Sequence, residues 1–192
     1  MKITGKDIGK KFGRNWIFRN QNFEIASGEP VAITGKNGAG KSTLLQIIAG
    51  YLTPSHGDIF MDGVKVDDST HSSVFIGPYT EIIEELTLNE FLNFHSKFKD
   101  SNCSIKKMAD SASLPLNKVI AEFSTGMKQR TKLLTAFFFE NDVIFMDEPT
   151  SNLDDEGFQW WESNISLLKK RLIILASNDN REIAVCEKQL KL

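Results

Sequence analysis

One stretch of nine residues decides the fold of this chain: Gly35-Lys36-Asn37-Gly38-Ala39-Gly40-Lys41-Ser42-Thr43. It fits the pattern G-x-x-x-x-G-K-[ST] of a phosphate-binding loop. Its small residues let the backbone wrap closely around phosphate oxygens, and the positive end of a following helix adds its field. The flanks agree, because 31–34 is a short apolar run typical of a buried strand and 42–49 predicts a helix closed by Gly50. The stretch therefore predicts a strand, a loop and a helix that bind the phosphates of a nucleotide.

Two side chains of this loop have chemistry of their own. Lys41 is expected to reach the β- and γ-phosphates, and the Ser42 hydroxyl is expected to ligate Mg²⁺. A chance glycine turn is the alternative interpretation, but the flanking strand and helix make it improbable. The predicted nucleotide-binding residues of the loop are Gly35, Asn37, Gly38, Ala39, Gly40, Lys41, Ser42 and Thr43.

A second apolar strand, Val143–Met146, delivers two adjacent carboxylates, Asp147 and Glu148. Asp147 is expected to hold Mg²⁺ directly or through water, and Glu148 to polarise the water that attacks the γ-phosphate. Two acidic residues at a strand end can also simply cap a helix. Their combination with Lys41 and Ser42 favours the catalytic interpretation.

The composition gives little reason to expect nucleic acid as a partner. Lys and Arg number 23 against 25 Asp and Glu, so the net charge is −2. Cys103 and Cys186 lie far apart and form no metal-binding pattern, which fits a reducing compartment. No run reaches the ~20 apolar residues of a membrane-spanning helix. Any membrane association is therefore expected to come through another chain.

The rest of the chain predicts an α/β fold with mostly parallel strands. Asp62-Gly63 lies between two short apolar runs and predicts a hairpin. The region from about 78 to 122 has apolar residues at helical spacing, and a further helix follows, reaching about Glu140. The last core strand is predicted at 172–176. The histidines are expected to be exposed: His56, His71 and His95.

Two further motifs lie around the acidic strand. The segment Phe123–Met127 reads F-S-T-G-M and resembles the signature LSGGQ of the ATP-binding cassette (ABC) family. With the residues after it, the segment is similar to the T-G-M-x-Q-R run of export-type cassettes. Ser151–Asp154 reads S-N-L-D and matches the S-x-L-D dimer loop of that family. The resemblance covers nearly all of the chain.

The resemblance implies the ABC ATPase fold. This fold is a P-loop NTPase core with a mostly parallel sheet, an N-terminal antiparallel β subdomain and a helical insert. The chain is then a single ATP-binding domain, 1–192. Its nucleotide-binding core is expected at 1–77 and 126–192, and the helical insert at 78–125.

The resemblance also implies function and partners. ATP, with Mg²⁺, is sandwiched in a head-to-tail dimer, so Ser124 and Gly126 would serve the nucleotide of a second copy. Phe12 falls where the family has an aromatic that stacks on adenine, and Trp16 is the rival candidate. The chain would power a separately encoded transmembrane permease, as an exporter, from the cytoplasmic face of the membrane. Ile82, Ile83, Leu86 and Leu88 would line the groove for that permease or form a buried core.

Two departures from the family pattern put the rate of hydrolysis in question. The glutamine expected after the strand that follows the hairpin is replaced by Pro78 or Tyr79, and the histidine after the last core strand by Asn178. Asn178 is expected to contact the γ-phosphate in place of that histidine. Slow hydrolysis follows from these replacements.

Two other functions stay open. One is a soluble cassette protein that acts on DNA or ribosomes, which usually has a coiled-coil insertion or a second cassette. The other is a regulatory clamp that binds ATP and hardly hydrolyses it, which the two replacements support.

Overall fold

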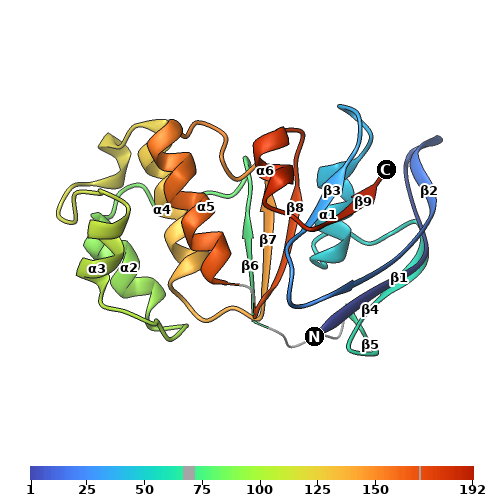
Figure 1. The fold of residues 1–192 in the computed structure, drawn as a ribbon, viewed down its shortest axis with the longest axis horizontal. Helices are drawn as coiled ribbons and strands as arrows, with labels where there is room; N and C mark the ends of the chain where they lie inside the picture. Colours follow the sequence, from blue (N-terminus) through green and yellow to red (C-terminus); the bar gives the residue numbers. More distant parts are fainter. Residues whose placement is uncertain (67–71, 169) are drawn as a thin grey trace. The chain divides into compact units, whose positions relative to one another are not determined.

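The computed structural model describes residues 1–66, 72–168 and 170–192, so His71 lies outside the described residues. Figure 1 shows the order of the elements along the chain. The strands are β1 (Lys2–Phe12), β2 (Asn15–Ala26), β3 (Val31–Thr34), β4 (His56–Met61), β5 (Val64–Lys65), β6 (Ser73–Ile76), β7 (Val143–Asp147), β8 (Leu172–Ala176) and β9 (Lys188–Lys191). The helices are α1 (Lys41–Ile48), α2 (Leu88–His95), α3 (Ile105–Ser111), the short 3₁₀ helix η2 (Ile120–Glu122), α4 (Thr125–Phe137), α5 (Asp155–Leu167) and α6 (Asn180–Ala184).

The chain forms two compact units. The first, here the nucleotide unit, comprises Met1–Phe75, Asp142–Glu148 and Lys169–Leu192. The second, here the helical unit, comprises Ile76–Asn141 and Pro149–Leu168. It includes α4 and α5 because α4 packs on both α2 and α5. The expected division into a core at 1–77 and 126–192 and an insert at 78–125 stays a prediction.

A five-stranded sheet in the order β6-β7-β8-β3-β9 forms the centre of the nucleotide unit. β3 pairs in parallel with β8 and β9, and β7 pairs in parallel with β8. Every residue of β3, β7 and β8 is buried, as expected for parallel strands covered on both faces. The sequence predicted β8 as the last strand, and that was wrong because β9 also joins the sheet. β9 is a mostly exposed edge strand of Lys, Gln and Leu, so it lacks the apolar pattern of a core strand.

The second sheet of this unit is antiparallel, in the order β2-β1-β4-β5. The predicted hairpin joins β4 and β5, and both of its turn residues have positive φ, 47° at Asp62 and 85° at Gly63. Positive φ at both central positions is the geometry that favours Asp-Gly in two-residue hairpins. The parallel core and the antiparallel β subdomain confirm the predicted α/β fold class.

The core of the nucleotide unit joins α1 to both sheets. Apolar side chains of α1, β1, β3, β4, β7 and β8 form one buried cluster. Leu44, Leu45 and Ile48 of α1 are completely buried in it. The position of α1, and therefore of the loop before it, is fixed by this packing.

The helical unit has a core of its own. Apolar residues from α2, α3 and α4 pack together, and α4 and α5 lie side by side in Figure 1. The N-terminus of α2 has a reciprocal cap, in which the Thr87 hydroxyl accepts from the Glu90 backbone and the Glu90 carboxylate accepts from the Thr87 backbone. Within the described ranges, no helix is long and apolar enough to cross a membrane.

One histidine prediction was wrong. His56 is exposed as expected, and its ring lies 3.2 Å from the Asp7 carboxylate. His95 instead packs edge-on against Phe139, with ring centroids 4.6 Å apart. The apolar neighbours of α2 cover it, and helical periodicity alone does not show that a polar residue lies on the buried face.

Candidate nucleotide-binding site

The phosphate loop lies between β3 and α1, as predicted. Its glycines Gly38 and Gly40 have φ of 80° and 98°, a conformation that side-chain-bearing residues avoid. At Gly40 space is also short, because an added Cβ would lie 2.4 Å from Cγ2 of Ile17. Gly40 is the N-cap of α1, so the first backbone N–H groups of that helix have no acceptor within the helix and are available to an anion.

Lys41 is buried, with 7% of its surface exposed. Its ammonium folds back over the loop and donates to the carbonyl oxygens of Gly35 and Lys36, at 3.3 Å each. Both contacts are long for hydrogen bonds. The cation is therefore held at the concave side of the loop by weak bonds that phosphate oxygens can replace.

A contact between two distant parts of the sequence defines the metal side of the site. The Ser42 hydroxyl donates to the carboxylate of Asp147, with a distance of 2.9 Å between the oxygens. Asp147 is 4% exposed at the end of β7. Burial raises the pKa of its carboxyl, and the charge of Glu148 adds to the rise, while the Ser42 hydrogen bond and Lys41 act in the opposite direction. A bound cation would offset the unfavourable free energy of burying the ionised carboxylate of Asp147.

The donor set fits Mg²⁺. Ser42 and Asp147 supply oxygen atoms, and Mg²⁺ is usually bound by one or two carboxylates together with substrate phosphates and water. Among the described residues there is no group of three or more His, Cys, Asp or Glu side chains that could hold a metal by itself. The residues therefore suit a cation that arrives with a phosphate ligand.

Glu148 has an unusual backbone. Its φ is +49°, and its N–H donates to the carbonyl oxygen of Ala176 at 2.9 Å. A non-glycine residue in this region is strained and is often found at functional sites. The side chain is exposed next to Asp147, where it can meet a substrate. The sequence predicted the role of Glu148 but gave no sign of this backbone conformation.

Asn178 lies beside the phosphate loop. It follows β8, and its amide donates to the side-chain oxygen of Asn37 within the loop. The turn around it is held by the Ser177 hydroxyl, which accepts from the Asp179 backbone at 2.9 Å. The sequence placed both asparagines at the site but did not predict that they pair.

The two candidate adenine platforms differ in access. Phe12 is 54% exposed, and the ammonium of Lys10 lies 5.2 Å from its ring centroid. Trp16 has two cations close to its ring, Lys11 at 5.5 Å and Arg19 at 4.2 Å. Phe12 therefore offers the freer ring, and its role in stacking on adenine stays a prediction.

The signature belongs to the helical unit. Ser124 caps α4 by accepting from the Met127 backbone at 3.2 Å, and it is exposed. Gly126 has no room for a side chain, because a Cβ would lie 2.8 Å from the carbonyl oxygen of Asn152 in the dimer loop. The structure thus brings the signature against the dimer loop, which the sequence placed apart.

Comparison with known proteins agrees with these motifs. A family model described as ABC transporter matches residues 18–151. The chain belongs to the ABC transporter family. It is 30% identical over 188 residues to the cytochrome c biogenesis ATP-binding export protein CcmA of Rhizobium etli, a match covering 92% of the chain and 87% of that protein. It is 33% identical over 172 residues to the ribose import ATP-binding protein RbsA of Oceanobacillus iheyensis, which covers 81% of the chain.

The chain spans about a third of that RbsA, 35% of its length. A solved dimeric ATP-binding cassette, in a post-hydrolysis state with ADP and Pi, has the same fold with a TM-score of 0.85. It is 22% identical to the chain, and the match covers 99% of the chain and 94% of that structure. The chain is thus an ABC-type ATP-binding subunit by family and by fold. Relatives named for import and for export are both among those it resembles.

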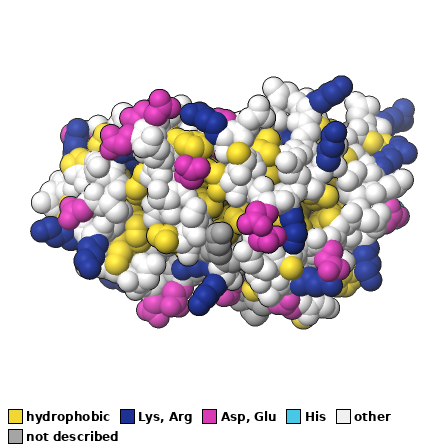
Figure 2. Space-filling view, in the orientation of Figure 1, with side chains coloured by type: hydrophobic (Ala, Val, Ile, Leu, Met, Phe, Trp, Pro, Cys, Tyr) yellow, Lys and Arg dark blue, Asp and Glu magenta, His cyan; other side chains and the backbone are white. Residues whose placement is uncertain are grey.

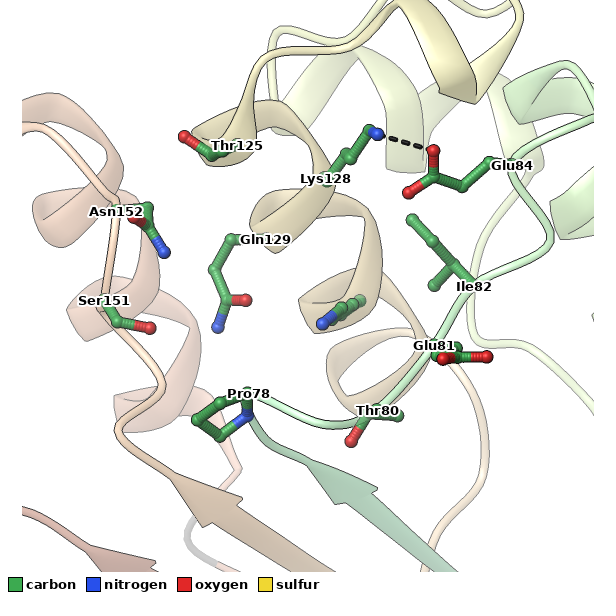
Figure 3. A pocket seen from close by; sticks show the side chains of 11 residues that line it. Pro78, Thr80, Glu81, Ile82, Glu84, Thr125, Lys128, Gln129, Ser151 and Asn152 are labelled. Atoms are coloured by element: carbon green, nitrogen blue, oxygen red, sulfur yellow. Dashed lines mark hydrogen bonds and ion pairs between the residues drawn. The ribbon is translucent and has the colours of Figure 1, made fainter.

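The helical unit of this ABC subunit contains a cavity of about 550 Å³. Figure 3 shows its three sides, formed by α4, by the segment after β6 and by the residues before α5. Ile82 lines the cavity, Ile83 is 43% exposed and Leu88 is completely buried, so the apolar run divides between groove and core. The sequence did not predict the charged lining. Its residues are Pro78, Thr80, Glu81, Ile82, Glu84, Thr125, Lys128, Gln129, Lys132, Ser151 and Asn152.

Proposed function

We propose that the chain is the ATP-hydrolysing subunit of an ABC transporter and works as a head-to-tail dimer with a second copy of itself. The observation that carries this proposal is the 2.9 Å contact between Ser42 and Asp147. It brings the hydroxyl of the phosphate loop and the buried carboxylate of β7 to one point, next to the N-terminus of α1. Family membership supports the same function.

Each residue of the site would have a separate role in binding or hydrolysis. Lys41 and the backbone of the loop bind and orient the phosphates, and Ser42 and Asp147 would hold Mg²⁺. The chemistry supplied with bound Mg²⁺ is neutralisation of charge on the phosphate oxygens. Glu148 accepts a proton from the attacking water at its carboxylate, and Asn178 donates a hydrogen bond toward the γ-phosphate.

The sandwich of two copies is supported by the exposure of the signature. Ser124 caps α4 with one lone pair of its hydroxyl and still faces solvent. The related cassette solved with ADP and Pi is dimeric. We infer that Ser124 and Gly126 complete the nucleotide site of the partner copy.

The partner in the membrane would be a separately encoded transmembrane permease. The cavity beside Ile82 offers a place for a segment of that permease, and the chain would then lie on the cytoplasmic face of the membrane. Export is favoured because the match to CcmA covers most of both chains, whereas the match to RbsA covers a third of that protein. A nucleic-acid partner has less support, since acidic and basic side chains are mixed on the face shown in Figure 2.

Replacement of Glu148 by Gln tests the proposed function. Glu148→Gln keeps the size and hydrogen bonding of the side chain and removes the base, so it should bind Mg-ATP, stop turnover and trap a dimer. Sedimentation with ATP measures the dimer, and phosphate release measures turnover. Ser124→Arg in the same background is the matched variant, because it should leave monomer ATP binding intact and prevent the dimer. A Glu148→Gln protein that stays monomeric with ATP and hydrolyses it normally would contradict the proposal.

A weakly hydrolysing clamp is the second candidate, and one specific observation favours it. The position of the family histidine holds Asn178, which is engaged with Asn37 rather than free. An ATP-driven dimer with negligible turnover, even with the permease present, would support the clamp over the transporter subunit.

A further inference from the structure

The start of α4 is fastened to the segment that contains the dimer loop, Ser151–Asp154. The buried amide of Gln129 donates to the carbonyl oxygen of Pro149 at 2.7 Å. One turn earlier, the bare backbone of Gly126 lies against Asn152. Figure 3 shows Gln129 and Thr125 on the side of Ser151 and Asn152, with Lys128 directed toward Glu84. One face of α4 therefore contacts the segment that contains the dimer loop.

Arg130 makes a third contact between α4 and this segment, and it also contacts the end of α3. Its guanidinium lies 2.7 Å from the Asp154 carboxylate and also donates to the carbonyl oxygen of Ala112, the C-cap of α3, at 3.3 Å. The Arg130 side chain is 13% exposed. One side chain thus connects α4, the end of α3 and the last residue of the dimer loop.

Asp154 also caps the next helix. It is the N-cap of α5, and its carboxylate accepts from the Gly157 backbone at 2.8 Å. Gly157 leaves room for the guanidinium, because a Cβ there would lie 3.1 Å from Nε of Arg130. The N–H of Gly157 and the guanidinium of Arg130 both lower the pKa of Asp154, so its charge is present at neutral pH.

We infer that Arg130 is a positioning residue, which holds the dimer loop and the signature as one preformed surface for the nucleotide of the partner copy. This inference rests on the proposed head-to-tail dimer. A loop that is already ordered loses less conformational entropy on association, so the dimer forms more readily.

If Arg130 only stabilised the fold, its removal would mainly lower the unfolding temperature. The structure predicts a different result. Asp154 is 70% exposed, and an ion pair with such an exposed member contributes little to the stability of the fold. Loss of the pair should therefore change the unfolding temperature only slightly. Its main effect should be a more mobile dimer loop and a weaker dimer.

The test compares Arg130→Gln with a matched control in the ATP-trapped Glu148→Gln background. The control is Lys118→Gln, which removes another ion pair of the helical unit, from Lys118 to Glu122 at 3.7 Å. Arg130→Gln should weaken the ATP-driven dimer about tenfold or more, measured by sedimentation. Monomer affinity for ATP should be unchanged, and amide hydrogen exchange should rise at 150–157. Asp154→Asn should weaken the dimer as well, and the double variant should be no weaker than the worse single one.

Each outcome has a clear meaning. Dimer affinity that is unchanged in Arg130→Gln while the parent dimerises would overturn the inference and leave the proposed function standing. A fall in unfolding temperature with no change in dimer affinity or in exchange at 150–157 would assign Arg130 a structural role and also overturn it. Failure of the Glu148→Gln parent to dimerise would overturn both.

Discussion

The phosphate loop with Asp147 and the turn that contains Asn178 would both face the γ-phosphate, yet they are built differently. Lys41 and Asp147 are 7% and 4% exposed and are held by strands and a helix packed in the core. Asn178 is exposed, and within the described part of the chain its side chain is held by a hydrogen bond to Asn37. Buried, multiply held groups change position little, whereas a single exposed side chain can be exchanged without repacking. The difference suggests that binding is fixed by the fold and that the rate of hydrolysis is set at positions such as Asn178.

The largest effect is expected from histidine at position 178. Asn178→His introduces a side chain that is longer and can become cationic, and a well-placed transition-state donor is worth about 10²–10³ in rate. Single-turnover hydrolysis at saturating ATP should become faster, by up to about 10²-fold, with little change in ATP affinity. Equal rates in the two proteins would mean that Asn178 already does this work or that another group has taken it over.

Loss of the buried cation is expected to come next. Lys41→Ala removes a charged hydrogen-bond donor to the phosphates, so ATP affinity should fall about 10- to 100-fold. Calorimetric titration measures the affinity. Lys2→Ala, which removes an exposed cation at the opposite end of β1 from Phe12, is the control. Unchanged affinity in Lys41→Ala would exclude this loop as the phosphate site.

Asp147→Asn tests the contribution of Mg²⁺ to ATP binding separately from the binding of ATP itself. The variant keeps an oxygen that can accept from Ser42 but loses the charge, so added Mg²⁺ should no longer strengthen ATP binding. The free protein should become more stable at neutral pH, because burial raises the pKa of Asp147 and its ionised form therefore opposes folding above the pKa of the unfolded chain. Thermal unfolding without ligand checks the sign. A lower unfolding temperature together with normal Mg²⁺ dependence would contradict the assignment.

The smallest effect is expected in the helical unit, at His95. Burial lowers the pKa of His95, and the charge of Lys99 lowers it further. A base with a depressed pKa in the folded state stabilises the fold above the pKa of the unfolded chain, about 6.5, and this stability is lost as the pH falls through it. The unfolding temperature should therefore drop by a few degrees between pH 7.5 and 5.5, and His95→Phe should reduce the drop. An identical drop in both proteins would show that other groups cause it.

The sequence predicted the features that depend on neighbouring residues. The phosphate loop, the strand ending at Asp147 and the Asp62-Gly63 hairpin each have a local pattern, and each was found where expected. The features it missed depend on tertiary contacts. The edge strand β9 is polar and gains its partner only in the folded sheet, and the burial of His95 depends on Phe139. The contact from Arg130 to Asp154 joins residues whose separate motifs gave no sign of each other.

A mixing experiment tests the central claim most directly. In a head-to-tail dimer, each site combines the phosphate loop of one copy with the signature of the other. Two Lys41→Ala copies therefore have two damaged loops, and two Ser124→Ala copies have two damaged signatures without the bulky arginine that prevents the dimer. A mixed dimer has one intact site, so mixing the two variants should restore ATP hydrolysis well above the sum of their separate rates. Hydrolysis that equals that sum, with mixed dimers demonstrated by mass spectrometry, would contradict the shared site.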